Sequence, residues 1–329
     1  MAQIYYEDDA ELAPIQDRSV AFLGYSPIAH AQALNLRDSG VDIRIGVPDD
    51  HPGITAALSA GLRVLSPLAA AAESDFFVCA APEEELADYL SQIDSELVTG
   101  DAVLVPHAFA VQTGLVSFPS QVDLGLLAPI ADGKKLRRAY AAGHGVAAVI
   151  AVAQDQSGEA WELFLSYAKA LGALRAGAIT TTFQEQYLSS VLAEQAVLGG
   201  VTALLKQTWQ VLVANGVDPD LAYLTCLEQL PAVQAAWQSA QTVPQSARRT
   251  ILTRQFGETA MQPVNSVIQN LFDQLTSEQL VTSFQSWGKA QMNLDPLAGT
   301  PEQAAAREQV AKLQEILTRV DNQLDEWEF

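Results

Sequence analysis

A strand-turn-helix unit at residues 19–40 is the feature that most constrains the fold of this chain. Its strand, turn and helix are predicted at Ser19–Leu23, Gly24 and Pro27–Asp38. Such a unit opens dinucleotide-binding domains, where the fingerprint G-x-G-x-x-G lets a pyrophosphate approach the backbone and lets the helix approach the strand. Ser26 and Ala29 stand at the places of the second and third glycines. The fold of the unit is therefore expected, whereas its ability to hold a nucleotide is open.

The first part of the chain alternates between short apolar strands and helices long enough to cross over a sheet. Strands are predicted at Ser19–Leu23, Val41–Val47, Arg63–Leu65, Asp75–Ala80, Ala102–Pro106, Val122–Ala128 and Ala147–Val152. Helices are predicted between these strands at Pro27–Asp38, Ile54–Ala60, Pro67–Glu73 and Glu83–Ile93, and after the last strand at Gly158–Leu171. This rhythm indicates an α/β fold with a Rossmann-like, mainly parallel sheet, which we expect to occupy residues 1–182.

From residue 183 onward only helical patterns occur, so a second, all-helical domain is expected over residues 183–329. Its helices are predicted at Glu185–Gln207, Leu205–Asn215, Pro219–Gln229, Ala232–Gln241, Val264–Gln274, Glu278–Lys289 and Glu302–Trp327. The last helix carries an apolar seam that packs on a neighbouring helix, either in the same chain or in a partner. The clearest loop is Asn293–Pro301.

The charge of the chain limits its partners. With 39 acidic and 18 basic side chains the net charge is −21, which repels polyanions. Nucleic acid and anionic membrane are therefore not expected as partners. The first nine residues are acidic and no run approaches the ~20 apolar residues of a membrane span, so we expect a cytoplasmic protein. Cys79 and Cys226 are expected to be buried thiols in a reducing compartment.

Several motifs occur in a fixed order over roughly residues 1–258. They are Ile4–Tyr6, Gly24–Tyr25, His30–Val41, Pro106–Phe109, Ala128–Pro129, Ile150–Asp155, Tyr167–Lys169, Arg175–Gly177, Thr181–Phe183, Glu194–Gly200 and Ala222–Tyr223. In order and content they resemble the ketol-acid reductoisomerase family of branched-chain amino-acid synthesis, in its short, class I form. The resemblance implies a Rossmann-like domain, a helical domain with a knotted path, and a homodimer whose helical domains interlock. It also implies an enzyme that uses two Mg²⁺ ions and NADPH.

The metal site implied by the resemblance is not matched residue by residue. The family holds two Mg²⁺ ions with four carboxylates on two helices. The corresponding positions here are Ser190, Glu194, Thr225 and Gln229. One carboxylate cannot offset the mutual repulsion of two hard cations, so no magnesium pair is expected. Glu228 does not replace Gln229, because it lies about 100° away around the helix.

Other positions also depart from the family pattern. The lysine that follows Ala-Pro falls at Ile130, and the Gly-Pro-Gly-His loop becomes residues 131–134, Ala-Asp-Gly-Lys. A second histidine becomes Gln112, and the substrate-binding serine falls close to Ile251. The sequence thus predicts a divergent member that has lost most of the catalytic residues.

Two residual catalytic candidates remain. His107 matches the family's active-site histidine and could polarise a substrate oxygen, although a histidine at a strand end is often only structural. Glu194 could keep a ligand role, or its motif could reflect helix packing alone. The basic cluster at residues 134–138 (Lys134, Lys135, Arg137, Arg138) is expected to be a solvated loop, with docking of an anionic ligand or acidic segment as the alternative. His144 is expected in a loop.

The candidate nucleotide site consists of Gly24, Tyr25, Ser26, Asp49 and Asp50. Carboxylates after the second strand would repel the 2′-phosphate of NADP and could accept the ribose hydroxyls of NAD. We therefore expect NAD rather than NADP if any dinucleotide binds. The same acidic turn could equally be a solvated loop.

Two functions follow from the sequence. The first is a non-catalytic reductoisomerase homologue, a pseudoenzyme kept as a dimeric scaffold with a regulatory or protein-binding role. The alternative is a repurposed NAD-dependent, metal-independent oxidoreductase or isomerase acting on a small hydroxy or keto acid.

Overall fold

The structure is a computed structural model that describes residues 2–238 and 263–275. The predictions for Ile251, for the loop at residues 293–301 and for the helices at residues 278–289 and 302–327 lie outside the described residues. The knotted path also depends on residues outside these ranges, so it stays a prediction.

The predicted sheet is present and is mainly parallel. Within the described residues it has nine strands in the order β1-β9-β8-β7-β6-β5-β2-β3-β4. They span Ile4–Tyr5 (β1), Ser19–Leu23 (β2), Asp42–Gly46 (β3), Arg63–Leu65 (β4), Phe76–Cys79 (β5), Ala102–Val105 (β6), Asp123–Pro129 (β7), Ala148–Gln154 (β8) and Ala178–Thr180 (β9). The pairs β1–β9 and β7–β8 are antiparallel, and the other pairs are parallel. The sheet order reverses between β2 and β5, which is where open α/β sheets form their ligand crevice.

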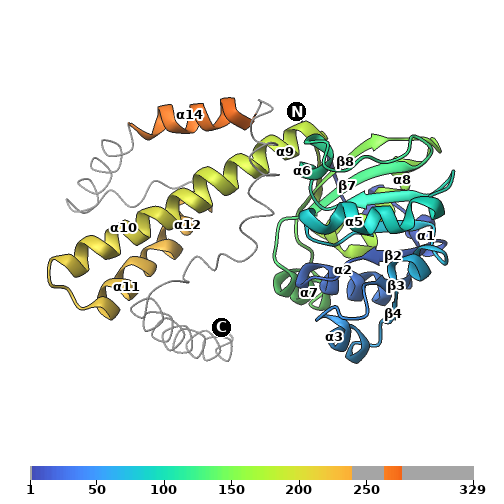
Figure 1. The fold of residues 1–329 in the computed structure, drawn as a ribbon, viewed down its shortest axis with the longest axis horizontal. Helices are drawn as coiled ribbons and strands as arrows, with labels where there is room; N and C mark the ends of the chain where they lie inside the picture. The colour runs from blue at the N-terminus through green and yellow to red at the C-terminus, as the bar shows by residue number, and fades with distance from the viewer. Residues whose placement is uncertain (1, 239–262, 276–329) are drawn as a thin grey trace. The chain divides into compact units, whose positions relative to one another are not determined.

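Helices cover both faces of the sheet (Figure 1). They span Ala13–Gln16 (α1), Pro27–Asp38 (α2), Ile54–Ser59 (α3), Pro67–Ala71 (α4), Glu83–Ile93 (α5), Phe109–Gln112 (α6), Gly133–Ala141 (α7) and Ala160–Leu171 (α8). On one face Phe22 and Phe76 join a buried cluster with α2 and α8, whereas Leu23 lies on the other face near Ala70 of α4. Successive strand residues point to opposite faces, so both layers of the core come from the same strands.

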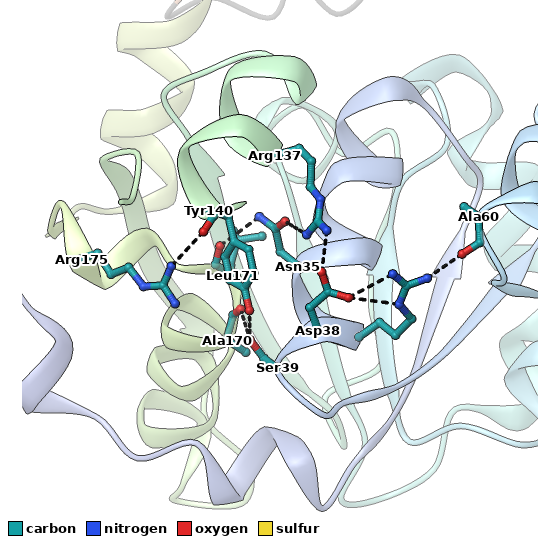
Figure 2. A network of polar contacts seen from close by, with 10 residues as sticks. Asn35, Asp38, Ser39, Ala60, Arg137, Tyr140, Ala170, Leu171 and Arg175 are labelled. Atoms are coloured by element: carbon teal, nitrogen blue, oxygen red, sulfur yellow. Dashed lines mark hydrogen bonds and ion pairs between the residues drawn. The ribbon is translucent and has the colours of Figure 1, made fainter. Parts of the chain in front are cut away.

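Helix α2 is fixed to its neighbours by a polar network (Figure 2). The fully buried Asn35 donates from Nδ2 to the Leu171 carbonyl of α8 at 3.2 Å and accepts from Arg137 of α7 at 2.8 Å. The ring of Tyr140 on α7 packs under the guanidinium of Arg175, and its hydroxyl is hydrogen-bonded to Ser39 at 2.7 Å. These bonds satisfy polar groups that would otherwise be costly to bury.

The network corrects one prediction. The basic cluster at residues 134–138 is not a loop, because these residues belong to α7, which packs alongside α2. Arg137 is paired with Asp38 as well as with Asn35. Leu136 supplies the buried anchor of this short helix, and one buried apolar side chain gives too little periodicity to reveal a helix from sequence. Strands β1 and β9 and helices α1 and α6, each of four residues or fewer, were also not predicted.

The helical part begins with a long continuous helix. It comprises α9 (Phe183–Leu192), the π-helical segment η4 (Ala193–Gly199) and α10 (Gly200–Ala214), and it is followed by α11 (Pro219–Leu227), α12 (Gln229–Gln238) and α14 (Val264–Leu275). Helix Phe183–Ala214 is long and apolar enough to pass a simple test for a membrane span, with a mean hydropathy of 1.5 in its most apolar stretch. One such helix is weak evidence for a membrane, so the expectation of no membrane association stays a prediction.

Candidate functional site

The glycine turn after β2 keeps the geometry of a dinucleotide fold. Gly24 has φ +97°, and a Cβ at this position would lie 2.3 Å from the backbone nitrogen of Ala81. Only glycine fits here, because the conformation is left-handed and the chain that follows β5 passes against it. The first glycine of the fingerprint is therefore retained for a structural reason.

The next two residues change what the start of α2 can bind. Ser26 is the N-cap of α2, and its Oγ accepts a hydrogen bond from the Ala29 amide at 3.3 Å. Pro27 occupies the first helical position and has no N–H group. A phosphate at a helix start is bound by these same amide groups. Of the first three helical positions, only Ile28 has an amide that is neither missing nor capped by Ser26.

Tyr25 packs against its neighbours in the fold. Its hydroxyl is hydrogen-bonded to Nδ1 of His30, and its ring would lie 2.6 Å from a Cβ built on Gly53. Burial raises the pKa of Tyr25 to about 12. The pKa of His30 is lowered, first by burial and then by the positive charges of Arg137 and Arg37. This pair is therefore neutral near pH 7.

The acidic turn after β3 is exposed. Asp49 and Asp50 both lie on the surface between β3 and α3. The charge of Asp50 acts on Tyr89 of α5, whose pKa is raised by burial first and then by Glu85 and Asp50. The turn therefore lies near α5, across the point where the sheet order reverses.

Three ionisable side chains from different parts of the chain converge at the carboxyl ends of β5 and β6. They are Glu83 in the first turn of α5, His107 after β6, and Glu194 in the π-helical segment η4. Burial raises the pKa of Glu83 to about 7, with further contributions from the negative charges of Glu194 and Glu84. The pKa of His107 is lowered by partial burial, and Glu194 opposes this effect. The charge of Glu194 therefore acts on both His107 and Glu83.

His107 is held in place by α9. The amide of Ala108 donates to Oε1 of the buried Gln186 at 2.8 Å, and the rings of Phe109 and Tyr187 pack at 6.1 Å between centroids. The charge of Glu194 acts on His107, so these two candidates lie near each other. The structure adds Glu83, which the sequence analysis missed; its place directly after Pro82 at the carboxyl end of a buried strand was the available signal.

The positions of the family's metal ligands do not form one site within the described chain. Ser190 and Glu194 lie on the helix that starts at Phe183, whereas Thr225 and Gln229 lie on α11 and α12, and α11 packs against α10. The Ser190 hydroxyl donates to the Tyr187 carbonyl of its own helix at 3.3 Å. Among residues 2–238 and 263–275, no group of three or more His, Cys, Asp or Glu side chains is arranged to hold a metal ion. One carboxylate with two hydroxyls and an amide does not fit two Mg²⁺ ions.

Other expected positions are also placed. Ile130 is 60% exposed at the end of β7, and Gln112 is exposed at the end of α6. His144 lies in a loop, and both cysteines are free and buried, as expected. Two cavities of about 360 and 420 Å³ lie away from all candidate residues, one between α5 and the loop at residues 115–119 and one beside α1.

Comparison with family models places the two parts of the chain. Residues 14–177 match the model for the NADPH-binding domain of acetohydroxy acid isomeroreductase, and residues 183–240 match that for the C-terminal domain of ketol-acid reductoisomerase. The ketol-acid reductoisomerase (NADP(+)) of Kocuria rhizophila is 43% identical over 235 residues, which cover 71% of this chain and 69% of the relative. The ketol-acid reductoisomerase (NADP(+)) of Renibacterium salmoninarum is 42% identical over 235 residues, which cover 71% of this chain and 69% of that relative.

Solved structures agree with this assignment. An NADH-preferring ketol-acid reductoisomerase from an uncultured archaeon aligns with a TM-score of 0.82 and 26% identity, covering 97% of this chain and 98% of that chain. A semialdehyde dehydrogenase NAD-binding protein from Cupriavidus necator, 17% identical with a TM-score of 0.62 over 79% of this chain and 99% of that chain, shares the fold alone. Because two family models match, the sequence identity to curated relatives is above 40% and the fold agrees, the chain belongs to the ketol-acid reductoisomerase family.

Proposed function

We propose that this chain is a non-catalytic member of the family, kept as a dimeric scaffold with a regulatory or protein-binding role. The observation that carries the proposal is the set of side chains at the four metal positions. Ser190, Glu194, Thr225 and Gln229 offer a single carboxylate. Hard divalent cations need charged oxygen ligands, and two of them close together need several.

The surroundings of the one remaining carboxylate support the proposal. The pKa of nearby Glu83 is raised to about 7, first by burial and then by the negative charges of Glu194 and Glu84, so this second carboxyl group is partly protonated near pH 7 and is a poor ligand for a hard cation. Ile130 puts an exposed apolar side chain where the family has a lysine. Ser26 and Pro27 reduce the amide donors available to a phosphate. These departures affect different ligands, whereas the core of the fold is preserved.

The test is turnover of acetolactate by the full-length protein with Mg²⁺ and either NADPH or NADH. The ketol-acid reductoisomerase of Kocuria rhizophila, 43% identical over 235 residues, serves as the positive control in the same assay. We expect no turnover above the no-enzyme rate from this chain. Turnover that depends on Mg²⁺ would refute the proposal.

The dimer is proposed from the exposed apolar side chains of the helical part. They include Val197, Leu198, Leu204 and Val211 on the long helix and Leu221 on α11, each more than half exposed. Apolar surface of this extent on one helix is typical of an interface. The proposed partner is a second copy of this chain. We also propose that the protein is cytoplasmic.

One observation favours the alternative, a repurposed NAD-dependent and metal-independent enzyme. His107, with its lowered pKa, is neutral near pH 7 and follows β6, next to the strand β5 that borders the switch point, and the charge of Glu194 acts on both His107 and Glu83. Neutral imidazole beside a carboxyl group is suited to proton transfer. The acidic turn at Asp49 and Asp50 would favour NAD over NADP, and a structural relative is described as NADH-preferring.

The two functions are separated by dinucleotide binding. The melting temperature is measured with NAD, NADH, NADP and NADPH, each with and without Mg²⁺. A ligand at about 100 times its dissociation constant adds roughly 2.7 kcal/mol of stability. A shift with NADH alone would support the alternative, whereas no shift with any of the four would remove it.

A further inference from the structure

We propose that Ser26 and Pro27 are the residues that exclude a dinucleotide from this fold, and that the glycine turn at Gly24 keeps the form of a pyrophosphate subsite. The inference rests on the proposed loss of function and goes beyond it, because it assigns the loss of cofactor to two named residues. The fold implies that a dinucleotide binds, but the hydrogen-bond donors at the start of α2 do not fit one. The inference rests on this disagreement.

The exclusion follows from competition for the same amide groups. A pyrophosphate at a helix start is held by the N–H groups of the first turn together with the positive end of the helix dipole. In this chain the Ser26 Oγ already accepts from the Ala29 amide at 3.3 Å, so the cap oxygen stands where a phosphate oxygen would. Pro27 removes a second donor, and the His30 amide is bonded to the Ser26 carbonyl at 2.8 Å. The Ile28 amide is left, which is too little for a doubly charged group.

The glycine turn of the subsite keeps its form. The Gly24 amide donates to the Gly46 carbonyl at 3.0 Å and the Ala80 amide to the Leu23 carbonyl at 2.8 Å, which extends the hydrogen bonding of β2 with β3 and β5 into the turn. The helix that follows has 12 residues, long enough for a full dipole at its start. The turn lies at the point where the sheet order reverses. The turn at Gly24 therefore does not have to move for the amides at the start of α2 to become available.

Negative charge is the competing explanation. The first turn of α5 contains Glu83, Glu84 and Glu85 and begins two residues after Ala81, whose backbone packs against Gly24. Carboxylates there would repel a pyrophosphate. The raised pKa of Glu83 leaves that carboxyl partly protonated near pH 7, which weakens the repulsion. Neutralising Glu83 and Glu84 separates this explanation from the loss of amide donors.

The chain contains the same local structure at a place with no ligand crevice. Ser66 caps α4 by accepting from the Ala69 amide at 3.3 Å, and Pro67 follows at the first helical position. Helix α4 comes after the edge strand β4 rather than at the switch point. A serine–proline start is therefore an ordinary structural cap, and it supplies a matched control with the same chemical change.

The experiment measures NADH and NADPH binding to the full-length protein by isothermal titration calorimetry. Four proteins are compared: the natural chain, S26G/P27S, the control S66G/P67S, and E83Q/E84Q. Circular dichroism and the melting temperature establish that each variant is folded. We expect S26G/P27S to bind NADH at least about tenfold more tightly than the natural chain, which is the effect of restoring one charge-assisted hydrogen bond. The other two variants should bind as the natural chain does.

Each other result overturns the inference in a recognisable way. If the natural chain binds NADH as tightly as S26G/P27S does, Ser26 and Pro27 do not exclude the cofactor, and the proposed loss of cofactor binding fails as well. If neither binds, the inference fails while the non-catalytic function stands. A gain in E83Q/E84Q would assign the exclusion to charge, and a gain in S66G/P67S would show a non-specific effect.

Discussion

Gly24 is a residue of the dinucleotide fingerprint that the fold itself requires, whatever happens to the ligand contacts around it. Its φ of +97° and the closeness of Ala81 are requirements of the fold, not of a ligand. Gly100 provides a matched comparison, because its φ is +99° and a Cβ there would meet no atom within 4 Å. The two glycines therefore separate backbone strain from steric overlap.

We predict that Gly100→Ala costs about 1 kcal/mol of unfolding free energy, the strain of a left-handed conformation alone. Gly24→Ala should cost at least about 3 kcal/mol, because the added methyl also overlaps the backbone at Ala81. Urea denaturation of both variants checks this difference. Equal losses would mean that the turn at Gly24 can relax.

From the raised pKa of Glu83 we predict that the stability of the protein depends on pH. Because burial raises its pKa in the folded protein to about 7, from an ordinary value of 4.5, the folded state binds the proton more tightly than the unfolded state does. This contribution is complete below about pH 4.5, and it is lost as the pH rises toward 7. Since the side chain is only partly buried, we expect about 1 kcal/mol after allowance for solvent screening.

Unfolding free energies measured from pH 4.5 to pH 8 check the Glu83 prediction. Glu83→Gln should flatten the fall in stability across this interval. Asp88→Asn, on the exposed face of the same helix, should keep it. An unchanged slope in Glu83→Gln would show that another group is responsible.

At the scale of elements, helix α2 depends on α7 and α8 through Asn35 (Figure 2). Asn35→Ala should cost about 2–3 kcal/mol, because two hydrogen bonds are lost and the Leu171 carbonyl loses its partner. Asn215→Ala is the matched control, since its Nδ2 donates to the Val211 carbonyl at 2.8 Å on an exposed surface. It should change the unfolding free energy by about 0.5 kcal/mol or less. Thermal and urea denaturation measure both, and similar losses would contradict a role for burial.

The sequence predicted the elements that carry a clear local pattern. Strand Ser19–Leu23 and helices Pro27–Asp38 and Glu83–Ile93 have the predicted bounds, because apolar spacing and capping residues act within a few residues of the chain. Helix α7 was missed because its stability comes from packing and from Arg137, which pairs with residues about a hundred positions away. Such contacts leave no signal in the local sequence.

At the scale of the molecule, the exposed apolar face of the long helix predicts a homodimer. We expect light scattering to give a mass near twice the 35.2 kDa of one chain. Leu204→Asp, at a side chain 57% exposed on α10, should shift the protein toward the monomer, because a charge would be buried in the interface. Leu58→Asp on α3, also at a side chain 57% exposed, should leave the mass unchanged. A monomeric natural chain, or equal behaviour of the two variants, would refute the predicted interface.

The sequence by itself determined the family, the α/β and helical architecture, and the identity of the residues at each expected ligand position. These are read from local periodicity and from aligned side chains, so they need no knowledge of distance. Only the tertiary structure decided that Glu83 joins His107 and Glu194, that the basic residues form a helix against α2, and that the Ser26 hydroxyl takes the Ala29 amide. Each of these depends on which groups the folded chain brings within contact, and pKa values and hydrogen bonds are set by that proximity.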